Sequence, residues 1–336
     1  MPDVPSSLPR SLQDLPPRWA HFCLGIERFV AEELGVELAG KRLAVGFSGG
    51  IDSTALLLSL RCLTARGGGR IVAAHLNHRL RPEADEDARW VAALCATLGV
   101  PCVIREADVA TLAEDSGAGI EETGRQARYA LYADVLTDHG ADFVALGHHL
   151  DDLAEDVLMR LARGTAWPGL AGMSGRDDTR RLLRPLLLTP KAELAAFLAE
   201  LGVPWREDAS NEDQRWSRNR VRASLVPLFL RENPSFLDSV ARLWRVGEMD
   251  RDYWGVQTAS VGERIPNAVL SKAHRALRLR LYKAALDRLG SAQVLSDTLW
   301  GLDRAWQAHR VGAVFQFPGE KTAVVTSHGV VFSAKH

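Results

Sequence analysis

Hydrophobic residues in the first two-thirds of the chain form short unbroken runs separated by longer segments with helical periodicity. The runs lie at residues 43–46, 71–74, 102–104 and 143–147. Short continuous apolar runs predict strands that are buried on both faces, and helices between them predict parallel βαβ units. We therefore expect an α/β domain with a parallel sheet.

The helical periodicity is clearest over residues 18–38, 83–98 and 190–201. After about residue 225 the pattern becomes mainly helical, and three short strands are predicted near the C-terminus at 313–317, 323–325 and 329–332. A proline-rich stretch at the N-terminus predicts a flexible tail. The predicted organisation is a tail over 1–17, an α/β domain with a linker helix over 18–222, and a mainly helical domain with a short β tail over 223–336.

Composition limits the classes of function. The 336 residues suffice for two domains, and the net charge of −1 gives no general attraction for nucleic acid, so any such binding must rest on local patches. No stretch is long and apolar enough for a membrane span, and the N-terminus lacks signal-peptide features, so we expect a cytoplasmic protein. The four cysteines form no Cys-x-x-Cys pair, which argues against a metal or iron–sulfur site. The sequence leaves the oligomeric state open, a homodimer included.

A glycine-rich turn follows the first predicted strand and precedes a predicted helix. Such a turn directs backbone N–H groups and the helix dipole at an anion, which predicts a phosphate site. A carboxylate is out of place in a pure anion site, so we expect Asp52 to hold Mg²⁺ against phosphate oxygens. The spacing matches neither the usual mononucleotide loop nor the dinucleotide fingerprint. A serine–glycine turn without a ligand is the alternative. The predicted phosphate-binding residues are Ser48, Gly49, Gly50, Ile51, Asp52 and Ser53.

Two further polar segments are expected to border this site. Residues 75–81 follow the second strand and contain histidine, asparagine and arginine side chains; a solvated loop is the alternative. On a predicted helix, Glu121, Arg125 and Arg128 share one face. The helix is either a surface helix with internal ion pairs or a carrier of arginines aimed at phosphates or at a substrate carboxylate.

The fourth strand leads into His148 and His149 and then into an acidic helix. Four carboxylates lie in its first turns, and they repel each other unless cations are placed among them. Mg²⁺ or an ammonium group explains this cluster better than a plain acidic turn. The carboxylates belong to Asp151, Asp152, Glu155 and Asp156.

Two later segments complete the pattern. Residues 163–173 are rich in glycine and predict a mobile loop that could cover the site during reaction. The densest basic cluster follows, and it predicts either binding of RNA phosphates or an inter-domain ion-pair network. Its members are Arg215, Arg218, Arg220 and Arg222.

Taken together and in order, these motifs resemble those of the tRNA(Ile)-lysidine synthetases, a branch of the N-type ATP pyrophosphatases with a Rossmann-like fold. The loop motif alone indicates only the superfamily, whereas the acidic helix and the later Ser-Asn and Arg-Asn segments make the match narrower. The matching pieces are residues 48–53, 75–81, Glu122 to Tyr129, 147–155, 160–164, 169–173, Asp208 to Asn211 and Arg218 to Arg222.

The resemblance implies a two-step reaction on the wobble cytidine of a CAU anticodon. ATP adenylates the C2 oxygen of the base and pyrophosphate leaves; an amine of free L-lysine then attacks C2 and AMP leaves. The product, lysidine, changes the codon read from AUG to AUA. Substrates are therefore ATP, L-lysine and tRNA(Ile), with Mg²⁺ as cofactor.

The resemblance also implies roles for particular residues. Catalytic roles fall to Asp52, His148, Asp152, Glu155 and Arg125. The lysine pocket would comprise Asp151, Asp152 and Glu155 with Arg125 and Arg128. The basic cluster at 215–222 and the C-terminal domain would bind tRNA. Carboxylates hold an ammonium group but favour its protonated form, so a carboxylate, His148 or His149 is expected to remove the proton.

Three other functions compete with this interpretation. A tRNA thiolation enzyme shares the adenylation step, but those with a cluster usually need Cys-x-x-Cys, which is absent here. An amidating synthetase would need a source of ammonia, and the chain shows no glutaminase domain. A non-catalytic nucleotide-binding module would not need an acidic cluster at the strand end.

Overall fold

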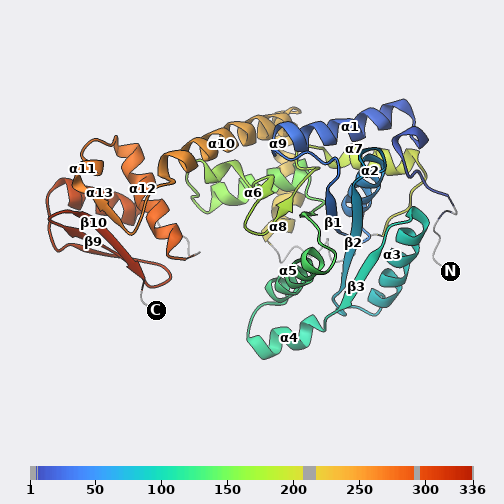
Figure 1. Ribbon diagram of the computed structural model, residues 1–336, viewed down its shortest axis with the longest axis horizontal. Helices are drawn as coiled ribbons and strands as arrows, with labels where there is room; N and C mark the ends of the chain where they lie inside the picture. The colour runs from blue at the N-terminus through green and yellow to red at the C-terminus, as the bar shows by residue number, and fades with distance from the viewer. Residues whose placement is uncertain (1–4, 6, 207–216, 291–295, 335–336) are drawn as a thin grey trace. The chain divides into compact units, whose positions relative to one another are not determined.

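The computed structural model describes residues 5, 7–206, 217–290 and 296–334 (Figure 1). The chain divides into two compact units. The first contains residues 1–163 and 172–243, and the second contains residues 164–171 and 244–336. The two units are described separately below.

A six-stranded sheet forms the centre of the first unit, in the order β3-β2-β1-β4-β6-β5. All neighbouring strands are parallel except β5 and β6. The four strands that the apolar runs predict are confirmed, but β3 lies at the edge of the sheet and is half-buried to exposed rather than buried on both faces. The short strands β5 and β6 were not predicted. The strands are β1 (Arg42–Gly46), β2 (Arg70–Asn77), β3 (Cys102–Glu106), β4 (Phe143–Ala145), β5 (Arg176–Asp177) and β6 (Leu182–Leu183).

Helices cover both faces of this sheet. The connections β1–α2–β2 and β2–α3–β3 run in one direction along the sheet, through α2 (Ile51–Gly67) and α3 (Ala84–Leu98). The chain then returns through α5 (Ile120–Asp138) to β4 on the other side of β1, so α3 and α5 lie on opposite faces (Figure 1). Leu131 and Val135 of α5 pack against Ala44 and Val144 in one apolar core. The order of strands therefore reverses between β1 and β4, which is where open α/β sheets bind ligands.

The other helices of the first unit include two segments that were not predicted, at 109–116 and 217–225, and one helix that is shorter than predicted. The N-terminal helix was expected to reach residue 38 but ends at Glu32, and Gly35 beyond it has φ +64°, a left-handed conformation incompatible with a continuing helix. This N-terminal helix is α1 (Pro17–Glu32). The others are α4 (Val109–Ser116), α6 (Leu150–Ala162), α7 (Lys191–Glu200), α8 (Ser217–Arg220), the π-helical turn η4 (Val221–Leu225) and α9 (Val226–Glu232).

The second unit combines helices with a four-stranded antiparallel sheet of order β7-β10-β9-β8. Helix α10 (Phe236–Thr258) begins in the first unit and continues into the second. The three C-terminal strands are confirmed, and β7 (Arg264–Pro266) joins them at the edge. The other elements are α11 (Asn267–Leu270), α12 (Arg275–Arg288), α13 (Ser296–Gln307), β8 (Val314–Phe317), β9 (Lys321–Thr326) and β10 (Gly329–Ala334).

A single apolar core joins the helices of this unit to its sheet. Tyr282 and Leu286 of α12 and Leu302 of α13 are buried against Val325 and Phe332 of the sheet. None of the described helices in either unit combines the length and the apolar character needed to cross a bilayer.

Candidate functional site

The loop between β1 and α2 is held in shape by its own hydroxyl groups. The Ser53 hydroxyl donates to the Gly50 carbonyl oxygen (3.0 Å) and accepts from the Ser48 backbone N–H (3.2 Å). Gly49 has φ +87°, which glycine adopts without steric cost. No side chain of the described residues caps the first turn of α2. Its N–H groups and dipole are therefore available to an anion at the reversal point of the sheet.

The loop that follows β4 packs directly on the β1–α2 loop. A Cβ atom added at Gly147 would lie 3.1 Å from the carbonyl oxygen of Asp52. Glycine at position 147 lets the two loops approach this closely. Residues that follow two neighbouring strands are thereby brought into one site.

His149 lies between the carboxylates of the two loops. Its Nε2 atom is 3.4 Å from Asp52 Oδ1 and 3.4 Å from Asp152 Oδ2, and its Nδ1 atom is 3.6 Å from Asp151 Oδ2. Burial alone would lower the pKa of His149, but the carboxylates of Asp151, Asp52 and Asp152 raise it to about 9. The imidazole is therefore a buried cation at neutral pH, and it joins the phosphate loop to the acidic helix.

The neighbouring His148 is neutral instead. Burial and the nearby Arg184 guanidinium lower the pKa of His148 to about 4, so the ring is neutral at pH 7. The Arg184 Nε–H group donates to His148 Nδ1 at 3.3 Å. Because arginine can only donate, Nδ1 is the acceptor and the ring proton lies on Nε2. Sequence reasoning missed Arg184, since nothing in its local sequence indicates a contact with a residue that follows another strand.

Two arginines supply the cations among the carboxylates of α6. Arg218 Nε donates to Glu155 Oε2 (2.8 Å) and its Nη2 to Asp152 Oδ1 (2.9 Å). Arg222 Nε donates to Glu155 Oε1 (2.5 Å) and its Nη2 to Asp152 Oδ1 (3.3 Å). Burial tends to raise the pKa of Asp152, but the charges of His149 and Arg218 hold it below its usual value. The cations that lie among these carboxylates in the structure are guanidinium groups, whereas the sequence suggested Mg²⁺ or an ammonium group, which stays a prediction.

Arg222 lies in a local change of helical register. Residues 217–232 form one continuous helical segment in which Val221–Leu225 is a π-helix, and the Val226 N–H donates to the Val221 carbonyl oxygen. Pro227 follows at once and has no N–H to continue the α-helical ladder. π-helical turns of this kind occur frequently at functional sites.

The other two carboxylates of the acidic helix are paired elsewhere. Asp151 Oδ2 accepts the Lys191 backbone N–H at the start of α7 (2.8 Å). Asp156 Oδ2 accepts from Arg160 Nε (2.8 Å) one helical turn away. Asp151 therefore ties α6 to α7 at the site, and Asp156 forms an intrahelical pair.

The environment of the Asp52 carboxylate is compatible with the predicted role as a metal ligand. Its Oδ1 atom is buried and receives no hydrogen bond of ordinary geometry from the described residues, although His149 Nε2 lies 3.4 Å away. The described residues contain no group of three or more His, Cys, Asp or Glu that could hold a metal by themselves. Mg²⁺ commonly uses one or two carboxylates together with phosphate oxygens and water. A single carboxylate beside an anion cradle suits that arrangement.

The arginines of α5 line a separate hollow. Arg125 and Arg128 are exposed and, with Gly119, Glu121 and Glu122, surround a cavity of about 380 Å³. The Arg125 guanidinium lies over the ring of Tyr129, 5.4 Å from its centroid. Among the described residues, neither arginine contacts the carboxylates of α6, so the structure does not bring these two parts of the predicted lysine pocket together directly.

Two predicted rim residues are interior instead. Strand β2 extends to Asn77, so His75 and Asn77 lie within it and are buried. His75 Nδ1 is 2.9 Å from the Phe47 carbonyl oxygen, and burial lowers the pKa of this imidazole. The expectation of a cationic rim is therefore wrong for His75, which braces the strand that leads into the phosphate loop.

The predicted tRNA-binding arginines have different environments in the structure. Arg218 and Arg222 contact the acidic pair, whereas Arg220, between them in sequence, is exposed. Arg215 and the segment Asp208 to Asn211 lie outside the described residues.

The glycine-rich segment that was expected to form a loop over the site belongs to the second unit from Gly164 to Ala171. Trp167 Nε1 donates to Asp250 Oδ2 of α10 (2.5 Å). A Cβ atom on Gly247 of α10 would lie 2.2 Å from the Cβ of Ala171, so the segment is packed closely against this helix. We call residues 164–171 the strap.

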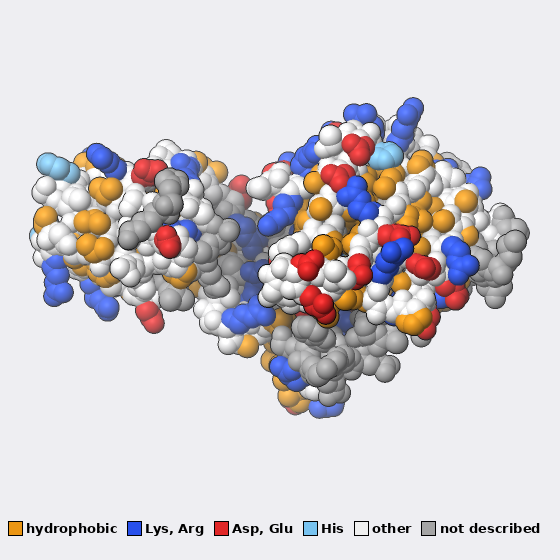
Figure 2. All heavy atoms as spheres, turned by 90° about the horizontal axis from the view of Figure 1, so that it is seen from below, with side chains coloured by type: hydrophobic (Ala, Val, Ile, Leu, Met, Phe, Trp, Pro, Cys, Tyr) orange, Lys and Arg blue, Asp and Glu red, His pale blue; other side chains and the backbone are white. Residues whose placement is uncertain are grey.

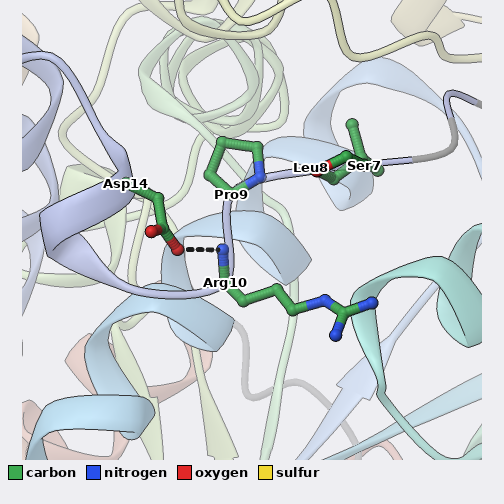
Figure 3. Close-up of a pocket in the computed structure, with 5 residues that line it drawn as sticks. All are labelled: Ser7, Leu8, Pro9, Arg10 and Asp14. Carbon is green, nitrogen blue, oxygen red and sulfur yellow. Dashed lines mark hydrogen bonds between the residues drawn. The ribbon is translucent and has the colours of Figure 1, made fainter.

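A further hollow, of about 580 Å³, lies near the N-terminus (Figure 3). The Arg10 backbone N–H donates to Asp14 Oδ2 (2.9 Å), and its side chain reaches the Thr97 carbonyl oxygen. Arg61 Nη1 donates to the Arg10 carbonyl oxygen (3.0 Å). These contacts fasten residues 10–14 to α2 and α3, and the lining residues include no pair suited to acid–base or nucleophilic chemistry.

Comparison with known proteins agrees with this geometry. A family model described as the PP-loop domain matches residues 24–229. A tRNA(Ile)-lysidine synthase from Nitratidesulfovibrio vulgaris is 45% identical over 315 residues, covering 86% of this chain and 91% of that protein. Another from Geobacter sulfurreducens is 36% identical over 330 residues, covering 92% of this chain and 68% of that protein.

A solved structure supports the fold independently. A U34-tRNA thiolase from Methanococcus maripaludis aligns with a TM-score of 0.55 at 18% sequence identity, covering 68% of this chain and 79% of that one. At this identity the likeness concerns the fold alone.

Proposed function

The chain belongs to the tRNA(Ile)-lysidine synthases, ATP-dependent ligases with a PP-loop domain, and from this premise we propose how its residues share the reaction. The reaction joins L-lysine to C2 of the wobble cytidine in the CAU anticodon of tRNA(Ile). ATP first adenylates the base with loss of pyrophosphate, and the lysine amine then displaces AMP.

One observation supports this division most strongly. His149 Nε2 lies 3.4 Å from Asp52 of the phosphate loop and 3.4 Å from Asp152 of the acidic helix. ATP bound at one loop would therefore be adjacent to an amine bound at the other. Holding both reactants in one site is what a two-step transfer through an adenylated base requires.

The phosphate loop, residues 48–53, binds ATP in this proposal. Its N–H groups and the N-terminus of α2 stabilise the charge that develops on pyrophosphate as the bond between the α and β phosphates breaks. Asp52 would hold Mg²⁺ with the phosphate oxygens, and the ion would supply further neutralisation of that charge.

The acidic pair Asp152 and Glu155 binds the ammonium group of lysine. In the structure these carboxylates are bonded to Arg218 and Arg222, so an incoming ammonium competes for the same oxygen atoms. Asp151 lies beside them and contributes negative charge. Arg125 and Arg128 line the separate hollow on α5 and would have to reach the carboxylate of a bound lysine from there, through charge-assisted hydrogen bonds.

The amine must lose a proton before it attacks, because its free pKa is about 10.4. His149 is already protonated at neutral pH, and Nδ1 of His148 is occupied by Arg184. We therefore assign proton acceptance to a carboxylate of Asp152 or Glu155 and the orientation of the site to the two histidines.

The second unit and Arg220 are proposed to bind tRNA. Among the described arginines of residues 218–222, Arg220 is the exposed one. Helix α10 follows in the chain and extends into the second unit. Contacts from arginine to phosphate would position the anticodon loop without reading its sequence.

Steady-state kinetics with amide variants tests the assignment of lysine to the acidic pair. Asp152→Asn and Glu155→Gln should raise KM for lysine more than KM for ATP, because the amide keeps its shape but loses the charge that attracts an ammonium group. Asp156→Asn is the matched control, since Asp156 pairs with Arg160 on the same helix. Equal increases in both KM values would contradict the assignment.

A further inference from the structure

Arg206, in the segment after α7, reaches back to the phosphate loop through its backbone. The Arg206 N–H donates to the Gly49 carbonyl oxygen at 2.9 Å. The Thr54 hydroxyl donates to the same oxygen at 3.3 Å. The carbonyl group of Gly49 is thus held from two sides, once by its own helix and once by a distant part of the chain.

Fixing this carbonyl also fixes the next N–H group of the loop. In a trans peptide the C=O and the following N–H point in opposite directions within the peptide plane, so the Gly49 oxygen and the Gly50 N–H lie on opposite sides of the C–N bond. The Gly50 N–H has one long contact, 3.4 Å to the Ser48 hydroxyl, at the exposed rim of the loop. The Arg206 hydrogen bond therefore keeps the Gly50 N–H on the side where a phosphate oxygen would bind.

The Arg206 side chain holds this backbone in place. Its Nε atom donates to Asp87 Oδ1 (2.7 Å) and its Nη2 to Glu86 Oε1 (3.3 Å), both in the first turn of α3. The Asp87 carboxylate is buried, and its other oxygen accepts from Arg81 Nη2 (2.6 Å). A carboxylate with two guanidinium partners is a firm anchor, because leaving it without them would bury an unpaired charge.

We infer that Arg206 is a positioning residue of the ATP site, which orients the Gly49–Gly50 peptide toward the phosphates through a side-chain anchor on Asp87. The inference rests on the proposed function only in taking this loop as the place where ATP binds. It predicts an effect on the affinity for ATP that is separate from the affinity for lysine and from the stability of the fold.

Direct binding measurements on the full chain test the inference. Calorimetric titration with Mg²⁺–ATP should give a Kd about tenfold higher for Arg206→Met than for the wild type, and Arg206→Lys should recover part of the loss. Titration with L-lysine should give the same Kd for all three. Arg89→Met is the matched control, because Arg89 is an exposed arginine on α3 whose Nε contacts only the Asp85 carbonyl oxygen among the hydrogen bonds described.

Amide hydrogen exchange supplies a second readout that does not depend on activity. The amide of residue 206 should exchange faster in Arg206→Met than in the wild type, because its hydrogen bond to Gly49 opens more often. If Arg206→Met does not fold, Asp87→Asn replaces it, since the amide keeps the shape of the anchor and removes its charge.

Two results would overturn the inference. One is an unchanged Kd for ATP in Arg206→Met or Asp87→Asn. The other is a parallel loss of affinity for ATP and lysine with a lowered thermal midpoint, which would indicate a purely structural role. Because binding rather than product is measured, normal ATP binding without any lysidine formation would count against the proposed function and leave this inference intact.

Discussion

His148 and His149 are adjacent in sequence but differ in protonation in the fold. Burial acts on both rings in the same direction, so their neighbours decide the difference. Three carboxylates surround His149 and raise its pKa to about 9, whereas Arg184 adds to burial and lowers the pKa of His148 to about 4. At neutral pH the site therefore contains one fixed cation and one neutral imidazole next to it.

The low pKa of His148 predicts how stability responds to acid. Between its ordinary pKa of 6.5 and about 4, the unfolded chain binds a proton at this residue and the folded chain does not. The free energy of unfolding therefore falls as pH falls through this window. His148→Gln removes that contribution, so its thermal midpoint should decline less steeply than that of the wild type from pH 6.5 to 4.

Parallel thermal denaturation curves across this pH range, followed by circular dichroism, would measure the difference. Identical pH dependence in the two proteins would show that His148 titrates normally in the fold.

The sequence predicted the chemistry of the site better than its pairings. Asp152 and Glu155 were recognised because repelling carboxylates at the start of a helix require cations nearby. Their partners Arg218 and Arg222 were recognised as a basic cluster, but they were assigned to tRNA, with an ion-pair network as the alternative. The pairing of each carboxylate with an arginine depends on how α6 packs against residues 218–222. The order of residue types along the chain does not predict that packing.

At the level of elements, the strap and α10 show how a glycine-rich segment can be firmly packed. Gly247 allows the strap to lie against the helix where any larger residue would collide with Ala171, and Trp167 adds a hydrogen bond to Asp250. Local composition suggested a mobile cover, because glycine permits many conformations. The contact with a helix that begins much later in the chain was not visible from sequence.

Alanine at Gly247 should destabilise the second unit. The new Cβ would lie 2.2 Å from the Cβ of Ala171, so helix and strap must separate, at a cost of about 1–3 kcal/mol in the free energy of unfolding. Gly255→Ala on the same helix is the control: nothing lies within 4 Å of its Cβ, and alanine favours the helix by about 0.5–1 kcal/mol. Chemical denaturation of both variants would measure the contrast, and equal stability would contradict the close packing.

Regular elements were predicted where the pattern was strong and missed where it was short. The four predicted strands of the first unit needed no tertiary information, because continuous apolar runs between helices suffice. Strands β5 and β6 have two residues each, too few for any periodicity to appear. The π-helical turn before Pro227 also depends on how the helix continues beyond the proline.

At the scale of the whole molecule, charge is distributed rather than concentrated. Acidic and basic side chains are interspersed over the face shown in Figure 2, in keeping with the net charge of −1. Affinity for tRNA must then come from a limited number of phosphate contacts at particular arginines. Binding of this kind weakens with salt in proportion to the number of contacts.

Arg220 provides a test of this view. Arg220→Met should weaken binding of tRNA and reduce the slope of log K against log salt by about 1, as expected for the loss of one phosphate contact. Arg89→Met on α3 should leave both unchanged. Filter binding over a series of salt concentrations would supply the slopes, and an unaltered slope for Arg220→Met would remove Arg220 from the proposed interface.

The central claim is that ATP held at residues 48–53 is cleaved between its α and β phosphates to activate a base for lysine. The most direct measurement incubates the purified protein with ATP, L-lysine and tRNA(Ile) carrying a CAU anticodon, and then identifies the nucleotide products and the modified base. The account predicts AMP and pyrophosphate, in amounts that depend on all three substrates, together with lysidine at the wobble position. Release of ADP and orthophosphate, or an unchanged cytidine, would contradict it.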